Sequence, residues 1–324
     1  MNEPRHVPVL LAEAIAALDP RPGGTYVDAT FGGGGYSRAL LALPVGRVVA
    51  VDRDPAAAAR ARELARDEPR LLPLEGRFGE LERLLGEAGI ARVDGIVADL
   101  GLSSDQLDDA ARGFSFQADG PLDMRMDPHG PTAADLLARL DEAALADLLA
   151  RLGDEPDARR IARAIVRRRA RAPLTRTGEL RALVTAVKGG RPGRHDPATR
   201  TFQALRMAVN DEPGELARLL AAATRLLVPG GRLAIVAFHS GEDRLVKRWV
   251  ESDGGRRRAG SRHRPPAPDA GPPRLVWAVR GPISPTPAEI ARNPRARSAR
   301  LRVASRTEAP AEAEGEPRFL GKAA

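Results

Sequence analysis

Residues 25–41, TYVDATFGGGGYSRALL, decide the fold. A short run of β-branched and aromatic residues ends in Asp28, four glycines follow at 32–35, and a helix-forming segment begins at once. Glycine lets a backbone turn sharply and lets other groups approach it closely. A strand, a glycine-rich loop and a helix in this order are typical of the ligand-binding edge of a parallel sheet.

The alternation continues outward from this stretch. Strands are predicted at 46–54, 70–78 and 93–101, with helices between them at 36–43, 55–67 and 81–89. After a long interruption come a helix at 212–227, an apolar strand ending at 238–240, a helix at 241–252 and two further strands at 274–283 and 298–307. Strands that alternate with helices predict an α/β fold with a doubly wound, parallel sheet.

The interruption is predicted to be an inserted all-helical domain. Two amphipathic helices are expected, at 132–153 and 156–173. In the second, arginines recur every fourth residue at Arg159, Arg163, Arg167 and Arg171, while Ile161 and Ile165 fall off that stripe and can face a core. The predicted domains are therefore 1–109 with 206–306, and the insert at 110–205, with a mobile loop at 253–274 and a disordered tail at 307–324.

Composition narrows the function classes. The 324 residues contain no cysteine, which excludes disulfides and thiolate chemistry, and no metal site is predicted. No apolar run approaches a membrane span, and no signal peptide is recognised, so a cytoplasmic protein is expected. The net charge is +8, yet residues 157–206 and 254–306 each carry a net charge of +11. Two basic blocks on an otherwise acidic chain favour an anionic polymer as partner over merely solvated surfaces.

Three ligands compete for the glycine loop. A phosphate-binding P-loop is excluded because Tyr36 and Ser37 follow the glycines where lysine and serine or threonine are required. A dinucleotide stays open, since Asp52 stands 20 residues beyond Gly32, where it could take a ribose hydroxyl. The carboxylate of Asp28, however, would repel a pyrophosphate and suits a ligand with a positive centre, such as S-adenosylmethionine. A tight turn without any ligand is the remaining alternative.

The strand ends supply the predicted partners of that ligand. Asp28, Asp52 and Asp99 each end a strand, and Phe78 follows another. In the S-adenosylmethionine interpretation, the glycines let the backbone approach the methionine and ribose, Asp52 takes the ribose diol and Phe78 flanks the adenine. Phe78 could equally be a core residue, and Asp99 could cap the next helix.

Several segments, in order, resemble the RsmH (MraW) family of bacterial 16S ribosomal RNA cytidine-N4 methyltransferases. They extend over nearly the whole chain to about residue 306, and GPLDMRMD (120–127) and FHSGEDRLVK (238–247) are the most specific of them. The resemblance implies a class I, Rossmann-like methyltransferase domain with a helical insert and S-adenosylmethionine as cofactor. It implies a cytidine in the decoding region of 16S rRNA, within the 30S small ribosomal subunit, as substrate, and leaves a homodimer as one option.

Matching the family's motifs position by position implies a set of cofactor-binding residues: Gly34, Gly35, Tyr36, Asp52, Phe78, Asp99 and Gln106. This sequence departs from the family at Tyr36, where histidine is usual, at Gly241, where leucine is common, and at Asp105, where proline is common. Binding is expected to survive these changes, with Tyr36 as the first suspect if it does not.

Catalytic and substrate-binding roles are predicted for a second set. Asp99, Asp123 and His239 are the catalytic candidates, the first to orient the amine or the cofactor. Asp123, Arg125 and Asp127 are the candidates for the cytidine pocket, whereas Met124 and Met126 are expected to pack. The substrate RNA is expected on these arginines: Arg159, Arg163, Arg167 and Arg200. For His239 a purely local hydrogen-bonding role is equally open, and His6 is expected to pack.

The same residues leave other functions open. The chain could methylate another acceptor, or it could be a non-catalytic RNA-binding factor for small-subunit assembly with a methyltransferase fold. The acids at Asp28, Asp52 and Asp99 argue against an inactive site. A nicotinamide oxidoreductase is the most distant alternative, because Asp28 disfavours its pyrophosphate.

Overall fold

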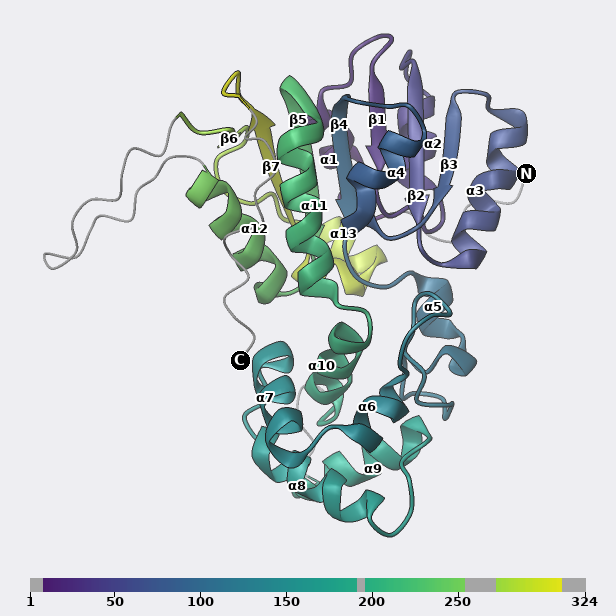
Figure 1. The fold of residues 1–324 in the computed structure, drawn as a ribbon, viewed down its shortest axis with the longest axis vertical. Helices are drawn as coiled ribbons and strands as arrows, with labels where there is room; N and C mark the ends of the chain where they lie inside the picture. The colour runs from purple at the N-terminus through teal and green to yellow at the C-terminus, as the bar shows by residue number, and fades with distance from the viewer. Residues whose placement is uncertain (1–7, 191–195, 254–271, 311–324) are drawn as a thin grey trace, which may run out of the picture. The chain divides into compact units, whose positions relative to one another are not determined.

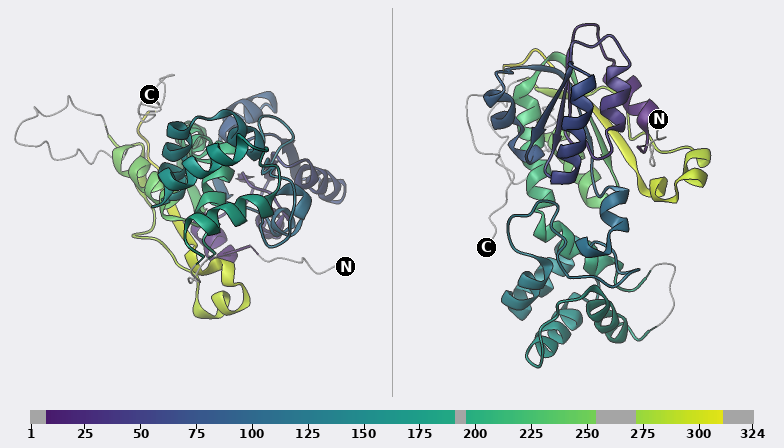
Figure 2. Two further views of the ribbon diagram at one scale, coloured as in Figure 1. Left: turned by 90° about the horizontal axis from the view of Figure 1, so that it is seen from below. Right: turned by 90° about the vertical axis from the view of Figure 1, so that its right-hand side faces the viewer.

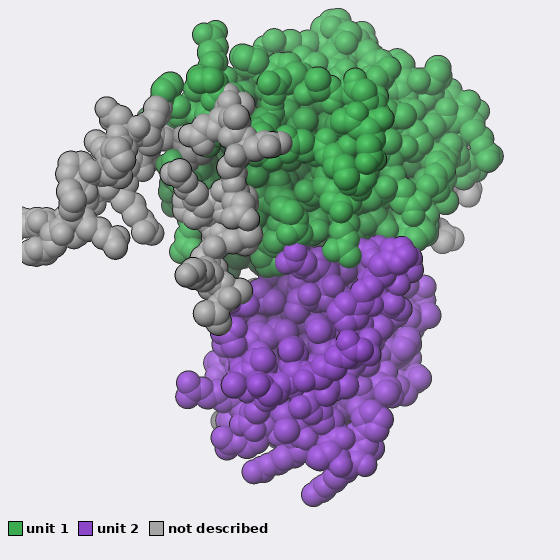
Figure 3. Space-filling view, viewed as in Figure 1, with its two compact units in different colours: residues 1–101, 213–324 green, residues 102–212 purple. Residues whose placement is uncertain are grey.

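The computed structural model describes residues 8–190, 196–253 and 272–310, which form two compact units. Unit 1 comprises 1–101 and 213–324, and unit 2 comprises 102–212 (Figure 3). The insert was predicted at 110–205; unit 2 is wider because Leu102 and Leu107 at one end, and Ala208 and Val209 at the other, pack against its core. Most of the predicted mobile loop and tail, like His6, lies outside the described residues.

Unit 1 is built on a seven-stranded sheet of order β3-β2-β1-β4-β5-β7-β6. Its strands are β1 (Thr25–Asp28), β2 (Arg47–Asp52), β3 (Leu71–Glu75), β4 (Val93–Asp99), β5 (Leu227–Ala237), β6 (Leu275–Trp277) and β7 (Arg300–Arg306). The first five pair in parallel, whereas β7 is antiparallel to both β5 and β6. The predicted α/β class is confirmed, with an antiparallel edge added to the parallel sheet.

Helices cover both faces of this sheet (Figures 1 and 2). The strands are apolar on both sides: in β2, Val48 and Ala50 join one core and Val49 and Val51 the other. The first core is closed by α1 (Leu11–Leu18), α2 (Gly35–Leu41) and α3 (Pro55–Asp67), and the second by α4 (Leu81–Glu87), α11 (Glu212–Leu226) and α12 (Ser240–Asp253). The remaining short helices of unit 1 are η1 (Phe78–Glu80), α13 (Pro287–Arg292) and η3 (Pro294–Ser298).

The sheet reverses its order at β1, which pairs with β2 on one side and β4 on the other. The chain passes from β1 to β2 and β3 in one direction and returns to β4 in the other, so the carboxyl ends of β1 and β4 flank a topological switch point. Asp28, Asp52 and Asp99 are the last residues of β1, β2 and β4. The predicted convergence of these acids at one sheet edge is confirmed.

Unit 2 is helical in its described residues apart from an isolated bridge between Pro121 and Arg176. Its helices are α5 (Ser104–Asp108), η2 (Ala110–Arg112), α6 (Ala133–Arg139), α7 (Glu142–Gly153), α8 (Ala158–Arg169), α9 (Thr177–Val187) and α10 (Thr199–Val209). The single helix predicted at 132–153 was wrong: α6 ends before Leu140, and the Asp141 carboxylate then caps α7 by accepting from the Ala144 amide.

Two α-helices of unit 1 were not predicted. The first residue of α1 follows Leu10, which has a positive φ of 55° and offers no capping side chain, so no start signal was visible. By contrast, α13 begins with Thr286, Pro287 and, three residues after the cap, Glu289, which is a start signature that could have been found. None of the described helices combines the length and apolarity needed to cross a membrane.

Candidate functional site

Asp28 holds the first turn of α2. Its carboxylate is fully buried and accepts hydrogen bonds from the Ser37 amide at 3.1 Å, the Ser37 hydroxyl at 2.7 Å and the Thr30 amide at 3.3 Å. Burial raises the pKa of Asp28 to about 6, although the Ser37 hydroxyl opposes this shift. These internal donors satisfy the Asp28 carboxylate, which has no exposed surface.

Backbone conformation or close contacts within the chain account for three of the four glycines, and Gly32 has a φ of +51°, in the left-handed region that favours glycine. Gly34 has a φ of +79°, and a Cβ there would lie 2.7 Å from the Phe31 ring. A Cβ on Gly35 would overlap the ring of Pro8. Gly33 differs: it is exposed, and no described atom lies within 4 Å of the place its Cβ would take. Gly33 is therefore the glycine of the four at which neither the backbone conformation nor a described neighbour requires glycine.

Gly33→Val is expected to separate ligand binding from folding. The new side chain enters open space, so the melting temperature should change little. The same side chain would fill the space beside the loop, and we expect cofactor affinity to fall by at least about tenfold, or about 1.4 kcal/mol. Isothermal calorimetry with S-adenosylhomocysteine measures this, and Gly86→Val, also in open space but on α4, is the control. Equal affinity in the two variants would place the ligand elsewhere.

Asp52 fastens the glycine loop from the neighbouring strand. One carboxylate oxygen accepts from the Gly32 amide at 2.8 Å, and the other accepts from the Asp54 amide at 2.9 Å. The Gly32 carbonyl is in turn held by the Arg60 guanidinium at 3.1 and 3.2 Å. Burial raises the pKa of Asp52, and these backbone donors oppose the shift. Each oxygen retains a lone pair, so Asp52 can still accept from a hydroxyl of a ligand.

Asp99 carries the unsatisfied acceptor of this edge. Its amide donates to the Thr30 hydroxyl oxygen at 2.7 Å, but its Oδ1 is buried and has no hydrogen-bond partner among the described residues. Burial raises the pKa of Asp99 well above its ordinary value, and the charges of Asp28 and Glu242 raise it further. A buried acceptor without a donor is costly, so this atom fits a ligand that brings an N–H group.

Tyr36 supports the loop from inside. Its side chain is 2% exposed within the core, and its hydroxyl donates to the Val9 carbonyl at 2.5 Å. Burial raises its pKa well above the ordinary value, and Asp99 and Asp28 add to the shift. The predicted contact of Tyr36 with the cofactor can therefore come from its backbone and not from its hydroxyl.

Two other predicted cofactor residues have local roles. Phe78 begins η1 and packs, partly buried, against the core formed with α4 and α11. In unit 2, Gln106 is 8% exposed and completes a capping box on α5: its amide donates to the Ser103 hydroxyl oxygen, and its side-chain carbonyl accepts from the Ser103 amide. Their contact with the cofactor stays a prediction.

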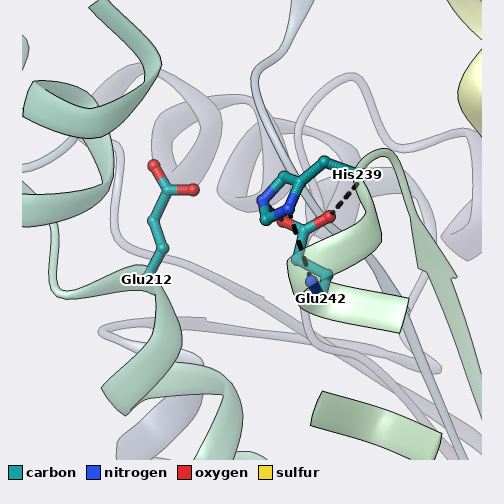
Figure 4. Close-up of side chains that lie close together, drawn as sticks. All are labelled: Glu212, His239 and Glu242. Carbon is teal, nitrogen blue, oxygen red and sulfur yellow. Dashed lines mark hydrogen bonds and ion pairs between the residues drawn. The ribbon is translucent and has the colours of Figure 1, made fainter. Parts of the chain in front are cut away.

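His239 and Glu242 cap α12 as a pair (Figure 4). The His239 Nδ1 accepts from the amides of Gly241 and Glu242 at 3.2 and 3.3 Å, and the Glu242 carboxylate accepts from the amides of Phe238 and His239. Because Nδ1 is the acceptor, the neutral ring carries its proton on Nε2, which is buried 3.2 Å from the Glu242 Oε1. The Nδ1 lone pair of His239 is thus used, whereas its Nε2 has no hydrogen-bond partner among the described residues, and its catalytic role stays a prediction.

Gly241 is explained by the same cap. A Cβ at this position would lie 3.0 Å from the Nδ1 of His239 and 3.1 Å from its Cε1. Any larger residue would therefore require the imidazole to shift by a few tenths of an ångström. Glycine at this departure from the family pattern lets the ring lie directly over the first turn of α12.

The LDMRMD segment is a rigid loop of unit 2. Asp123 and Arg125 form a bidentate ion pair at 2.7 and 2.8 Å, and Arg125 holds the pKa of Asp123 below its usual range. Met124 has a positive φ of 60° and is fully buried, with its carbonyl and the Met126 amide both bound by the Asn210 side chain. The predicted packing of both methionines is confirmed, whereas the paired Asp123 is a poor proton acceptor.

Three arginines of the predicted stripe have the expected orientation, whereas the fourth, Arg171, lies beyond the end of α8 at Arg169. Arg159, Arg163 and Arg167 are exposed on α8, while Ile161 and Ile165 are fully buried in the core of unit 2. Arg163 meets Glu142 at 3.2 Å, an exposed pair of small energetic value. Arg200 is also exposed and donates to the Asp154 carbonyl at 2.9 Å. Nothing in these contacts buries the stripe.

Sequence reasoning missed the residues that organise the site from behind. Thr30 and Ser37 join Asp28 and Asp99 into one hydrogen-bonded network, and Glu242 places a second buried carboxylate near Asp99. A signal existed for Ser37, since a serine at the third position of a helix after a buried acid can donate to it. Thr30 carried no signal, because its partner Asp99 is 69 positions away.

The doubly wound sheet, its switch point and the strand-end carboxylates of Asp52 and Asp99 match a class I, S-adenosylmethionine-dependent methyltransferase. Comparison with known proteins places the chain within that class. Residues 3–307 match the model of the MraW methylase family, and the chain belongs to this family. It is 56% identical over 312 residues to "Ribosomal RNA small subunit methyltransferase H" of Rhodospirillum centenum, covering 96% of this chain and 95% of that protein. The protein of the same name from Hyphomonas neptunium is 52% identical over 310 residues, covering 95% and 91%.

Proposed function

We propose that this protein transfers a methyl group from S-adenosylmethionine to the exocyclic N4 of a cytidine in the decoding region of 16S rRNA, within the 30S subunit. The methyltransferase class rests on the family, and the rRNA substrate on relatives named as small-subunit rRNA methyltransferases. The observation that carries the site is the buried Oδ1 of Asp99, which has no hydrogen-bond partner in the described part of the chain and lies at the switch point beside the glycine loop.

Different residues of the chain are assigned to different parts of the cofactor. Gly33 and its neighbours Gly34 and Gly35 admit the methionine and ribose against the backbone, and Asp52 accepts from the ribose diol. Phe78 and Gln106 complete the binding set with the adenosine. When bound, S-adenosylmethionine supplies a methyl group that its sulfonium charge has already activated.

Asp99 is the residue that we assign to the chemistry. The lone pair of the cytosine N4 amine is delocalised into the ring, so the amine is a weak nucleophile until an acceptor draws on its protons. The Oδ1 of Asp99 is a buried acceptor that can orient that N–H in line with the methyl group. Its raised pKa also suits it to take the proton that methyl transfer releases.

The RNA backbone is assigned to exposed arginines of unit 2. A base in structured RNA must be unstacked before it enters a methyl-transfer site, so the protein must hold the surrounding phosphates. Arg159, Arg163 and Arg167 form one exposed row on α8, and Arg200 lies on α10. Arg125, paired with Asp123, remains the candidate for the cytidine itself.

Reversing Arg163 and Arg167 to Glu is expected to weaken binding to small subunits by at least about tenfold and to lower the slope of log affinity against log salt by about two. Filter binding between low and moderate salt measures both quantities. The matched control reverses Arg62 and Arg66, which are also exposed and four residues apart, on α3. An equal salt slope in both variants would show that the α8 row is an ordinary solvated surface.

Methyl transfer from labelled S-adenosylmethionine tests the proposed function. Small subunits from a strain lacking the activity, free 16S rRNA and large subunits would be compared, and the labelled nucleoside identified by mass. N4-methylcytidine in the small subunits is the expected product. Cofactor binding without label on any particle would instead favour the non-catalytic assembly factor. A homodimer stays a prediction, which sedimentation of the same protein tests.

A further inference from the structure

Residues 8–10, here named the strap, cross the glycine loop. The Pro8 ring occupies the space that a side chain on Gly35 would need, and the Val9 carbonyl accepts from the Tyr36 hydroxyl at 2.5 Å. Val9 is 3% exposed and Leu10 is fully buried. The strap therefore contacts two consecutive residues, Gly35 and Tyr36, at the point where the loop becomes α2.

The far end of the strap is fastened to α13. The Leu10 amide donates to the Oε1 of Glu289 at 2.7 Å, across 279 positions of sequence. Glu289 stands three residues after Thr286, the cap of α13, and its amide donates to the Thr286 hydroxyl oxygen. In this pattern a glutamate ordinarily folds back onto the amide of its own cap residue. Here its Oε1 instead accepts from a segment at the other end of the chain.

The strap is not in a conformation that it would keep by itself. Leu10 has a φ of 55° and a ψ of 31°, a left-handed backbone conformation that residues other than glycine rarely adopt. Such strain persists only where surrounding contacts impose it. Two hydrogen bonds, one at Val9 and one at Leu10, together with the buried Leu10 side chain, supply those contacts.

We propose that Tyr36 and Glu289 are positioning residues for S-adenosylmethionine: they hold the strap, and the strap holds the glycine loop in its ligand-binding form. The inference rests on the proposed placement of the cofactor on that loop. Neither residue needs to touch the cofactor. The Tyr36 hydroxyl holds Val9 of the strap beside the glycine loop, and the Glu289 carboxylate holds Leu10 at the other end of the strap. Removing either hydrogen bond therefore loosens the strap and, with it, the support of the loop.

Calorimetry with S-adenosylhomocysteine and initial rates on small subunits test the strap. Tyr36→Phe keeps the packing and removes only the hydroxyl, and Glu289→Ala removes the acceptor. Each is expected to raise the cofactor Kd and KM by about tenfold while kcat at saturating cofactor stays within about twofold. Glu289→Gln retains a side-chain oxygen that can accept from Leu10, and it should restore most of the affinity. Glu63→Ala, which removes an exposed carboxylate from α3, is the control.

The double variant Tyr36→Phe with Glu289→Ala sharpens the test. Because both changes release the same strap, its Kd should rise by clearly less than the product of the two single effects. Unchanged affinity in both single variants, or equal loss in Glu289→Gln and Glu289→Ala, would overturn the proposal. If Gly33→Val still weakened cofactor binding in that case, only the proposal about the strap would fail. If it did not, the placement of the cofactor on the loop would fail as well.

Discussion

Asp99→Asn is expected to lower methyl transfer by about 10²- to 10⁴-fold at saturating cofactor, because it removes the carboxylate assigned to the amine proton. The same change should stabilise the cofactor-free protein at neutral pH. The Oδ1 of Asp99 has no partner in the described structure, and the charges of Asp28 and Glu242 oppose its ionisation. An amide carries no charge into this position.

The expected gain in stability of Asp99→Asn over the wild type depends on pH, and its direction follows from the raised pKa of Asp99. A carboxyl whose folded pKa is raised binds more protons in the folded state than in the unfolded state, so its contribution to stability falls as pH rises above about 4. Asp99→Asn removes this loss. We expect the free energy of unfolding to exceed that of the wild type by about 1–3 kcal/mol at pH 7, and the difference to vanish near pH 4.

Denaturant unfolding at several pH values and single-turnover methyl transfer together check this prediction. Asp94→Asn is the control: it removes a carboxylate near the other end of β4, where Asp94 accepts from the Thr25 amide at 2.8 Å. It should leave the rate unchanged. Full activity in Asp99→Asn would assign proton acceptance to another group, and a loss of stability at pH 7 would show that Asp99 has a donor in solution.

Asp52→Ala is expected to raise the cofactor Kd by about 10²- to 10³-fold. The ribose diol would lose a charged acceptor, and each such hydrogen bond contributes about 1.5–3 kcal/mol. The Gly32 amide would also lose its acceptor at 2.8 Å, which loosens the loop. Because burial raises the pKa of Asp52, wild-type affinity should weaken as the pH falls and this carboxylate gains its proton.

Calorimetry as a function of pH measures both effects. Asp54→Ala is the matched control, since Asp54 lies two residues away and its carboxylate caps α3 by accepting from the Ala56 amide at 3.0 Å. Its loss should cost about 1 kcal/mol of stability without a comparable loss of affinity. Unchanged affinity in Asp52→Ala would remove Asp52 from the site.

The sequence by itself determined the alternation of strands and helices, the position of the helical insert and the acids at the strand ends. These features are local: a period of two or 3.6 residues and a glycine run are visible within a few neighbours. The buried Ile161 and Ile165, opposite the exposed arginines of α8, were predicted for the same reason. Family motifs added the cofactor and the reaction, which periodicity alone could not supply.

Only the tertiary structure decided what each polar side chain does. The buried Asp28 carboxylate accepts from the Ser37 hydroxyl, and the His239 ring caps α12 through its Nδ1. Asp99, by contrast, is left with a buried oxygen and no described partner. The decisive partners lie far apart in sequence: Thr30 is 69 positions from Asp99, and Leu10 is 279 from Glu289. These long-range pairs decide which hydrogen-bonding groups are satisfied within the protein and which remain for a ligand. No local sequence pattern encodes such pairs.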